Sequence, residues 1–316
     1  MDRTKPQTRR RRTGRSGPGV KRSNARGQRR GTHGRPQQQQ QGGPQSPRST
    51  PRGQLPADIV YGFNPVTVAL NSEHLKVLYF DKSRQGEKYQ LLHAQAKDQG
   101  VEIQPLQRQG WAKVLPAESH QGIAGRLHGM PQVFIEEIVE HAGEDSCILV
   151  LDQVQDPQNL GAVLRTAAAT GVDAVVLPKA GGCPLTPAVH KASAGMSLMV
   201  PIVENENLAR VLDYLKDQGY WVVGCDSEGG EDATLFEFPH KRVMVMGNEA
   251  EGMRRLVRES CDYIVRIPMA NSVESLNISV AAAVVLYLAK ADLARAAMEE
   301  NHNGAGNGEA NLPEAG

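Results

Sequence analysis

The stretch 152-DQVQDPQNLGAVLRTAAATGVDAVVLP-178 carries the strongest indication of the fold. It follows the apolar run 147-CILVL-151, contains a predicted helix at 159–170, and ends in a second apolar run, 174-AVVL-177. An apolar strand, a helix and another apolar strand in this order form the repeating unit of a parallel sheet covered by helices. The alternation continues with strands predicted at 220–225, 243–246 and 263–267 and helices at roughly 186–194, 206–218, 252–258 and 276–297. We therefore predict an α/β fold.

Polar side chains within this stretch indicate a functional site. Asp156 precedes Pro157, which favours a helix N-cap followed by proline at the first helical position. Asn159 and Arg165 lie six positions apart, so on a helix they point about 120° apart around the axis. Spacing alone also allows Arg165 to face solvent. Gly161 lies between them and permits another backbone to approach closely.

Two further segments place polar residues beside apolar elements. In 243-VMVMGNEAEGM-253, Gly247 ends an apolar strand, and Glu249 could act in the site or complement the dipole of the next helix. In 267-IPMANSVESLNIS-279, Ser275 and Asn277 precede an apolar helix and could act as caps. Burying polar groups costs free energy unless they are paired, so three such segments suggest one shared site.

The three segments together resemble the SpoU/TrmH family of RNA ribose 2'-O-methyltransferases. The matching patterns are N-L-G-x-x-x-R, G-x-E-x-x-G-M and I-P-M-x-x-x-x-x-S-L-N-x-S. The resemblance implies a C-terminal trefoil knot of the SPOUT type, with helices on both faces of a mostly parallel sheet, and a homodimer. It implies that S-adenosylmethionine binds at Met246, Gly247, Ile267, Ser275 and Leu276. The residues that it implies for catalysis are Asn159, Arg165, Glu249 and Asn277.

The sequence of residues 57–127 predicts a small α/β unit that precedes the C-terminal half, in which the three segments lie. A helix begins near Asn64-Pro65 and is followed by a strand at 75–80, a helix at 88–100 and a strand at 101–105. The runs 61-YGFNPVTVALN-71 and 120-HQGIAGR-126 resemble the L30e-like RNA-binding domain found in some SpoU-type enzymes. The helical side chains that we expect on one buried side are Leu91, Leu92, Ala94 and Ala96.

The charge distribution divides the chain further. Residues 1–56 hold 15 Lys and Arg and one acid, whereas the rest holds 21 basic and 34 acidic residues. The 1–56 arm lacks the apolar residues needed to offset chain entropy, so we predict that it is disordered. It could bind RNA phosphates or serve only as a linker, and its Arg-rich composition leaves a transit peptide possible. We expect a linker and short helix at 128–142, a methyltransferase domain at 143–298 and a flexible tail at 299–316.

Other classes of protein find little support in the sequence. The four cysteines lack a C-x-x-C pair and the histidines lack metal-ligand spacing, so we expect no metal site. The richest apolar run, 280-VAAAVVLYLA-289, is too short to span a membrane, and we expect a cytoplasmic protein. Because the N-terminal unit precedes the catalytic half, the chain resembles those family members that methylate guanosine in bacterial 23S rRNA. A tRNA 2'-O-methyltransferase and a non-catalytic rRNA-binding or ribosome-assembly factor remain alternatives.

Overall fold

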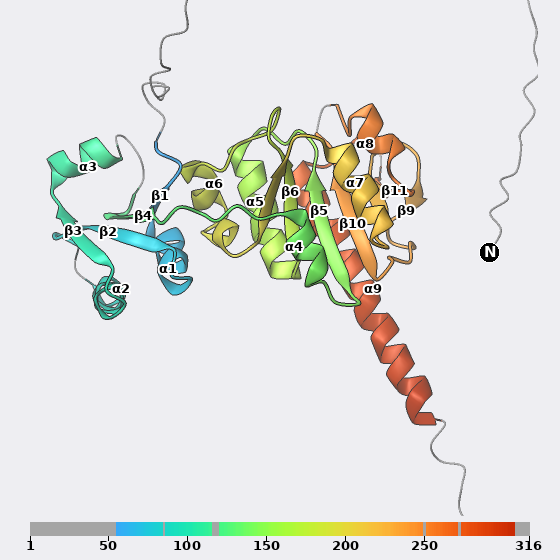
Figure 1. Cartoon of the computed structure of the whole chain (residues 1–316), viewed down its shortest axis with the longest axis horizontal. Helices are drawn as coiled ribbons and strands as arrows, with labels where there is room; N and C mark the ends of the chain where they lie inside the picture. The colour runs from blue at the N-terminus through green and yellow to red at the C-terminus, as the bar shows by residue number, and fades with distance from the viewer. Residues whose placement is uncertain (1–54, 85, 116–119, 249–250, 271–272, 307–316) are drawn as a thin grey trace, which may run out of the picture. The chain divides into compact units, whose positions relative to one another are not determined.

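The computed structural model describes residues 55–84, 86–115, 120–248, 251–270 and 273–306, with backbone alone for 296–306 (Figure 1). The basic arm, apart from Leu55 and Pro56, and Glu249 lie outside the described residues, as do 307–316 of the expected tail. Within the described part, no helix is both long and apolar enough to cross a bilayer.

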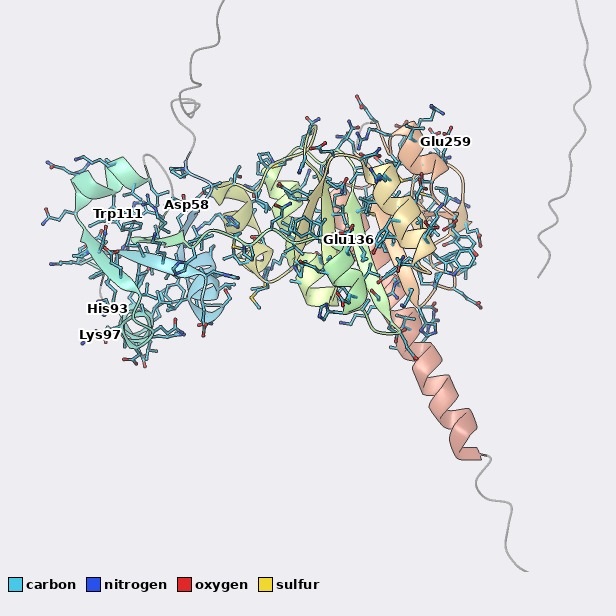
Figure 2. All side chains as sticks on the ribbon, viewed as in Figure 1. Asp58, His93, Lys97, Trp111, Glu136 and Glu259 are labelled. Atoms are coloured by element: carbon cyan, nitrogen blue, oxygen red, sulfur yellow. The ribbon has the colours of Figure 1, made fainter. Side chains whose placement is uncertain are left out.

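The N-terminal unit is built on a four-stranded sheet of order β1-β4-β2-β3. Only the β2–β3 pair is parallel. One face packs against α1 and α2. The other packs against Trp111 of α3, labelled in Figure 2, and against Leu115 just after that helix. The elements are β1 (Ile59–Tyr61), α1 (Phe63–Asn71), β2 (Leu75–Asp81), α2 (Glu87–Asp98), β3 (Glu102–Leu106), α3 (Arg108–Val114) and β4 (Ile123–Leu127).

The C-terminal half is built on a seven-stranded sheet of order β7-β6-β5-β10-β8-β11-β9, and all of its pairings are parallel. β10 lies between β5 and β8, although it is formed about a hundred residues after β5. Its elements are α4 (Ile135–Glu140), β5 (Ser146–Leu151), α5 (Pro157–Thr170), β6 (Ala174–Pro178), α6 (Pro187–Ala192), β7 (Ile202–Asn205), α7 (Leu208–Asp217), β8 (Trp221–Cys225), β9 (Glu231–Asp232), β10 (Lys241–Met246), α8 (Arg255–Glu259), β11 (Tyr263–Arg266) and α9 (Ile278–Gly306), with a 3-10 turn, η1, at Met196–Leu198.

Helices cover both faces of this sheet, as predicted. Alternate residues of a strand point to opposite faces. Leu149 and Leu151 of β5 therefore join the core beneath α5 and α9, whereas Ile148 and Val150 join the core beneath α4 and α7. Burial on both faces explains why these strands read as continuous apolar runs.

Several sequence expectations need correction. On α2, Leu92 and Ala96 are buried, but Leu91 is 64% exposed and Ala94 is also exposed. The helix packs chiefly against β3, an edge strand of its small sheet, so buried positions one turn apart suffice. Helix α9 continues to Gly306, well past the expected end at 297 and into the segment expected to be a flexible tail. Strands β1, β4, β7 and β9 were not predicted.

Candidate active site

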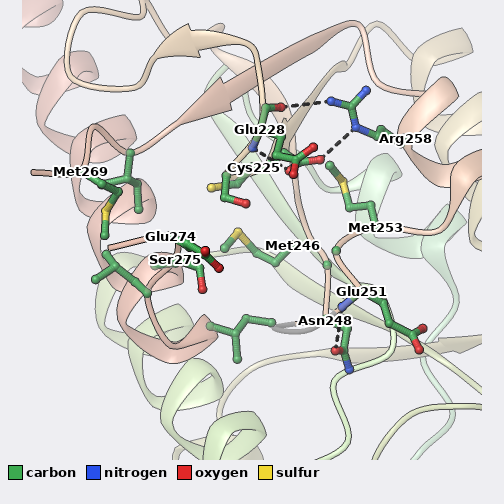
Figure 3. Close-up of a pocket in the computed structure, with 18 residues that line it drawn as sticks. Cys225, Glu228, Met246, Asn248, Glu251, Met253, Arg258, Met269, Glu274 and Ser275 are labelled. Atoms are coloured by element: carbon green, nitrogen blue, oxygen red, sulfur yellow. Dashed lines mark hydrogen bonds and ion pairs between the residues drawn. The ribbon is translucent and has the colours of Figure 1, made fainter. Parts of the chain in front are cut away.

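A cavity of about 380 Å³ opens beside the carboxyl ends of β8, β10 and β11 (Figure 3). This volume lies within the range of about 300–1,000 Å³ that is typical of ligand pockets. In α/β folds, the carboxyl ends of parallel strands are where ligands bind. All five residues expected at the cofactor line this cavity: Met246, Gly247, Ile267, Ser275 and Leu276.

The glycine at the end of β10 is needed because another backbone passes close to it. A Cβ on Gly247 would lie 2.2 Å from the carbonyl carbon of Gly252 and 2.3 Å from the nitrogen of Met253. Asn248 and Gly252 exchange two backbone hydrogen bonds of 2.9 Å, which close the loop between them. The Asn248 side chain also donates to the carbonyl of Gln153 at 3.0 Å and so joins this loop to the first segment.

A buried carboxylate fixes the chain just after the loop. Asp152 follows β5 and is fully buried. Its carboxylate accepts a hydrogen bond from the backbone N–H of Arg254 at 2.8 Å and another from the Arg254 Nε at 2.7 Å. Burying a carboxylate is costly unless it is paired in this way. Asp152 therefore holds the start of α8 against the end of β5.

The first and third segments meet through two asparagines. Asn277 Nδ2 donates to Asn159 Oδ1 at 3.0 Å. The Asn277 Oδ1 also accepts from the N–H and the hydroxyl of Ser279, at 2.9 and 2.6 Å, and thereby caps α9. Asn277 therefore caps α9, as predicted, and also links the third segment to the first. The predicted cap at Asp156 is confirmed, because its carboxylate accepts from the N–H of Gln158 at 2.8 Å.

The two remaining residues expected in catalysis differ in position. Arg165 projects from α5 and is exposed, and it is not among the residues that line the cavity. Its exposed position agrees with either a solvent-facing side chain or one that meets a large substrate. Glu249 lies outside the described residues, between Asn248 and Glu251, both of which line the cavity.

A fourth lining segment, Cys225–Glu228, was not anticipated from the sequence. It begins at the last residue of β8 and brings Asp226 and Glu228 to the cavity, where Glu251 and Glu274 also lie. The wall is thus rich in carboxylates, with Arg258 as the basic residue among the described lining residues. Burial raises the pKa of the Cys225 thiol to about 12, so it lines the cavity as a neutral group.

Two protein-family descriptions match the chain. Residues 146–287 match the SpoU rRNA methylase family, and residues 59–131 match the RNA 2'-O ribose methyltransferase substrate-binding domain. These ranges correspond to the seven-stranded and four-stranded sheets. Among the described residues, no group of three or more His, Cys, Asp or Glu is arranged to hold a metal ion.

The chain is also similar to curated proteins and solved structures. It is 37% identical over 234 residues to the 23S rRNA (guanosine-2'-O-)-methyltransferase RlmB of Photobacterium profundum, a match that covers 73% of this chain and 96% of that protein. It is 38% identical to RlmB of Bordetella pertussis, a match that covers 72% of this chain and 95% of that protein.

A solved RNA 2'-O ribose methyltransferase superposes with a TM-score of 0.63 at 26% identity, covering 74% of this chain and 88% of that one. The SpoU methyltransferase AviRb of Streptomyces viridochromogenes, solved with its cofactor AdoMet, shares the fold with a TM-score of 0.65 at 24% identity, covering 75% and 90%. The fold, the order of the three segments and these similarities show that the chain belongs to the SpoU rRNA methylase family.

Proposed function

We propose that the protein transfers a methyl group from S-adenosylmethionine to the 2'-hydroxyl of a ribose in RNA. The observation that carries this proposal is the convergence of the segments. The second and third segments line one cavity, and Asn277 of the third is hydrogen-bonded to Asn159 of the first.

The cavity suits the cofactor in chemistry as well as size. S-adenosylmethionine supplies an electrophilic methyl group on a sulfonium and also carries an ammonium group. Carboxylates from Asp226, Glu228, Glu251 and Glu274 complement these positive charges. Met246, Ile267 and Leu276 provide apolar surface for the adenosine. The close approach of the backbone at Gly247 leaves main-chain groups to hold polar atoms of the cofactor.

The ribose hydroxyl must lose its proton as its oxygen bonds to the methyl carbon. Arginine is essentially always protonated, so Arg165 is a poor general base. Its exposed guanidinium is suited to holding the phosphate beside the reacting ribose, and that phosphate or a water molecule can take the proton. Asn159, Asn277 and Glu249 would orient the ribose and Arg165, because correct alignment alone accelerates transfer greatly.

The four-stranded unit offers a surface suited to RNA. Phe63 and Tyr89 form an edge-to-face aromatic pair with centroids 5.5 Å apart. The exposed Lys88 ammonium lies 4.8 Å from the centre of the Phe63 ring and 5.3 Å from that of Tyr89. Gln121 joins them by accepting from the Phe63 N–H at 2.9 Å. A cation beside aromatic rings is a combination that binds phosphates and unstacked bases.

Within RNA, a guanosine of bacterial 23S rRNA is the substrate that we propose, because two relatives carry that activity in their names and are matched over nearly their whole length. In the same proposal, residues 57–127 bind the substrate, 143–298 carry the knot and the chemistry, and the protein acts in the cytoplasm, where bacterial ribosomes are made.

We also propose a homodimer. Val280 and Tyr287 lie seven positions apart on α9 and are about half exposed, so they give one apolar side on which a second copy could pack.

Mapping of ribose methylation tests the proposal. Ribosomal and transfer RNA from cells with and without the gene would be compared at nucleotide resolution. Loss of one 2'-O-methylguanosine from 23S rRNA, restored by the wild-type gene, is the expected result. Loss of a tRNA methylation would favour the alternative substrate, and unchanged methylation of both RNAs would favour a non-catalytic role.

A further inference from the structure

Residues beyond the three family segments hold one wall of the cavity in place. That wall is Asp226–Glu228, which follows β8 and has no regular secondary structure of its own. A short polar loop keeps a defined shape only if enough contacts offset its conformational entropy. Two hydrogen bonds from backbone N–H groups supply part of this restraint. The Asp226 N–H donates to the carbonyl of Val265 at 3.0 Å, and the Glu228 N–H donates to the Asp226 side-chain Oδ1 at 3.0 Å.

The chain just beyond the wall also runs tightly against β11. Gly230 has a φ of +81°, and a Cβ there would lie 2.3 Å from the carbonyl oxygen of Ile264. Any other residue would push the loop away from the sheet. The far end of the loop is therefore fixed by close packing, and the stretch that faces the cavity depends on side chains.

Arg258 provides these side-chain contacts. Its Nε donates to Asp226 Oδ2 at 2.9 Å, and its Nη2 donates to the carbonyl of Glu228 at 3.2 Å (Figure 3). The Asp226 side chain is only 15% exposed, so water weakens this pair less than it weakens a surface pair. The hydrogen bond to Asp226 also raises the pKa of Arg258. A planar guanidinium can reach both acceptors at once, which a lysine ammonium cannot do with the same geometry.

Arg258 lies on α8, which begins two residues after the end of the second segment, 243–253. The beginning of that helix is fixed to β5 by the contacts between Asp152 and Arg254. One short helix thus connects the first segment, the second segment and the Asp226–Glu228 wall.

We propose that Arg258 is a positioning residue that sets the Asp226–Glu228 wall for the cofactor. This inference rests on the proposed function, because it takes the cavity to be the S-adenosylmethionine site. Arg258 acts through Asp226 and Glu228 and takes no part in transfer itself. Its removal should weaken binding of the cofactor while leaving RNA binding and the chemical step intact.

Titration calorimetry with S-adenosylmethionine on the full-length protein tests this. We expect Arg258→Ala to raise Kd and the KM for the cofactor by roughly tenfold, which corresponds to about 1.4 kcal/mol. Turnover at saturating cofactor and the Kd for RNA should stay within about twofold of wild type. The cofactor Kd of Arg258→Lys should lie between those of the wild type and Arg258→Ala, because lysine keeps the charge but can reach only one of the two acceptors.

Arg255→Ala is the matched control. Arg255 lies on the same helix, is 76% exposed and pairs only with Glu259 among the described residues, at 2.8 Å. Its replacement should leave the cofactor Kd unchanged. Asp226→Asn weakens the same pair and also removes a carboxylate from the cavity wall, so the double variant with Arg258→Ala should bind the cofactor little more weakly than Asp226→Asn alone.

The outcomes separate the inference from the proposed function. If the wild-type protein does not bind S-adenosylmethionine, the proposed function fails, and this inference fails with it. If the wild type binds but Arg258→Ala behaves like Arg255→Ala, only the inference is wrong. A fall in turnover at saturating cofactor with unchanged Kd would also overturn it. Should Arg258→Ala not fold, Arg258→Lys and Asp226→Asn decide, and a wild-type Kd in both would overturn it.

Discussion

Asn277 Nδ2 donates a hydrogen bond to Oδ1 of Asn159, a residue 118 positions earlier in the chain, at 3.0 Å. The bond joins the start of α9 to the first turns of α5, two helices that pack on the same face of the seven-stranded sheet. The same asparagine caps α9 through its Oδ1. One side chain thus serves both the stability of a helix and the geometry of the site, and these roles can be separated by experiment.

Asn277→Ala should lower the free energy of unfolding by about 1 kcal/mol through removal of the cap, and should also reduce methyl transfer. Asn207→Ala is the control, because Asn207 caps α7 by accepting from the Arg210 N–H at 3.2 Å, away from the cavity. Urea unfolding and single-turnover transfer would be measured for both. Equal losses of activity would mean that Asn277 acts only as a cap.

Arg165→Ala should reduce methyl transfer by on the order of a hundredfold while leaving the Kd for S-adenosylmethionine nearly unchanged. The physical reason is that Arg165 is exposed on α5 and does not line the cavity, whereas a phosphate clamp acts on the RNA. Arg210→Ala, an exposed arginine on α7, provides the control. A comparable rise in the cofactor Kd for Arg165→Ala would contradict the assignment to the RNA side.

His190 should make stability depend on pH. It is buried, its Nδ1 is hydrogen-bonded to the Ser197 hydroxyl at 2.8 Å, and burial lowers its pKa from 6.5 to about 4. In the unfolded chain His190 therefore takes up a proton as pH falls through about 6.5, whereas in the folded protein it takes up that proton only near pH 4. Stability is fully present above pH 6.5 and is lost as pH falls toward 4, by up to about 3 kcal/mol.

Urea unfolding at pH 7.5, 6 and 5 checks the expected decrease. In His190→Gln the fall in stability between pH 7.5 and 5 should be smaller than in wild type. His128→Gln replaces an exposed histidine and should retain the wild-type slope. Identical slopes in the wild type and both variants would show that His190 does not contribute.

Removal of residues 1–54 should weaken RNA binding, chiefly at low salt. The deletion takes away 15 basic residues and one acid and spares Leu55, which packs against the core of the four-stranded unit. Every phosphate that the arm no longer neutralises should reduce the log–log salt slope by roughly 0.7–0.9. Turnover at saturating RNA should persist. Fluorescence anisotropy across a salt series makes the measurement, and an unchanged affinity and slope would show that the arm does not capture RNA.

The sequence was most informative where a residue's own chemistry imposes a conformation. The apolar runs at β5, β6, β8 and β10 predicted strands because residues buried on both faces must be apolar. Gly161 was expected to admit another backbone, and a Cβ there would lie 2.9 Å from the backbone nitrogen of Ser193. Local steric demands of this kind can be recognised without tertiary information.

The sequence was uninformative where structure depends on distant partners. Strand β9 has only two residues and exists because β11 pairs with it. The Asp226–Glu228 wall is an ordinary polar loop in the sequence, and nothing local reveals that Arg258, 32 residues later, holds it beside the cavity. The charged pair between Asp152 and Arg254 was missed for the same reason, since 102 residues separate its members.

The position of β10 between β5 and β8 has a consequence for biosynthesis. Residues 241–246 must be present before β5 and β8 can be joined in one sheet, because each pairs with β10. Pairings between residues so far apart in sequence close large loops and slow folding. The methyltransferase half therefore cannot complete its sheet until most of the chain has left the ribosome, whereas the four-stranded unit, which ends at Leu127, can form much earlier during translation.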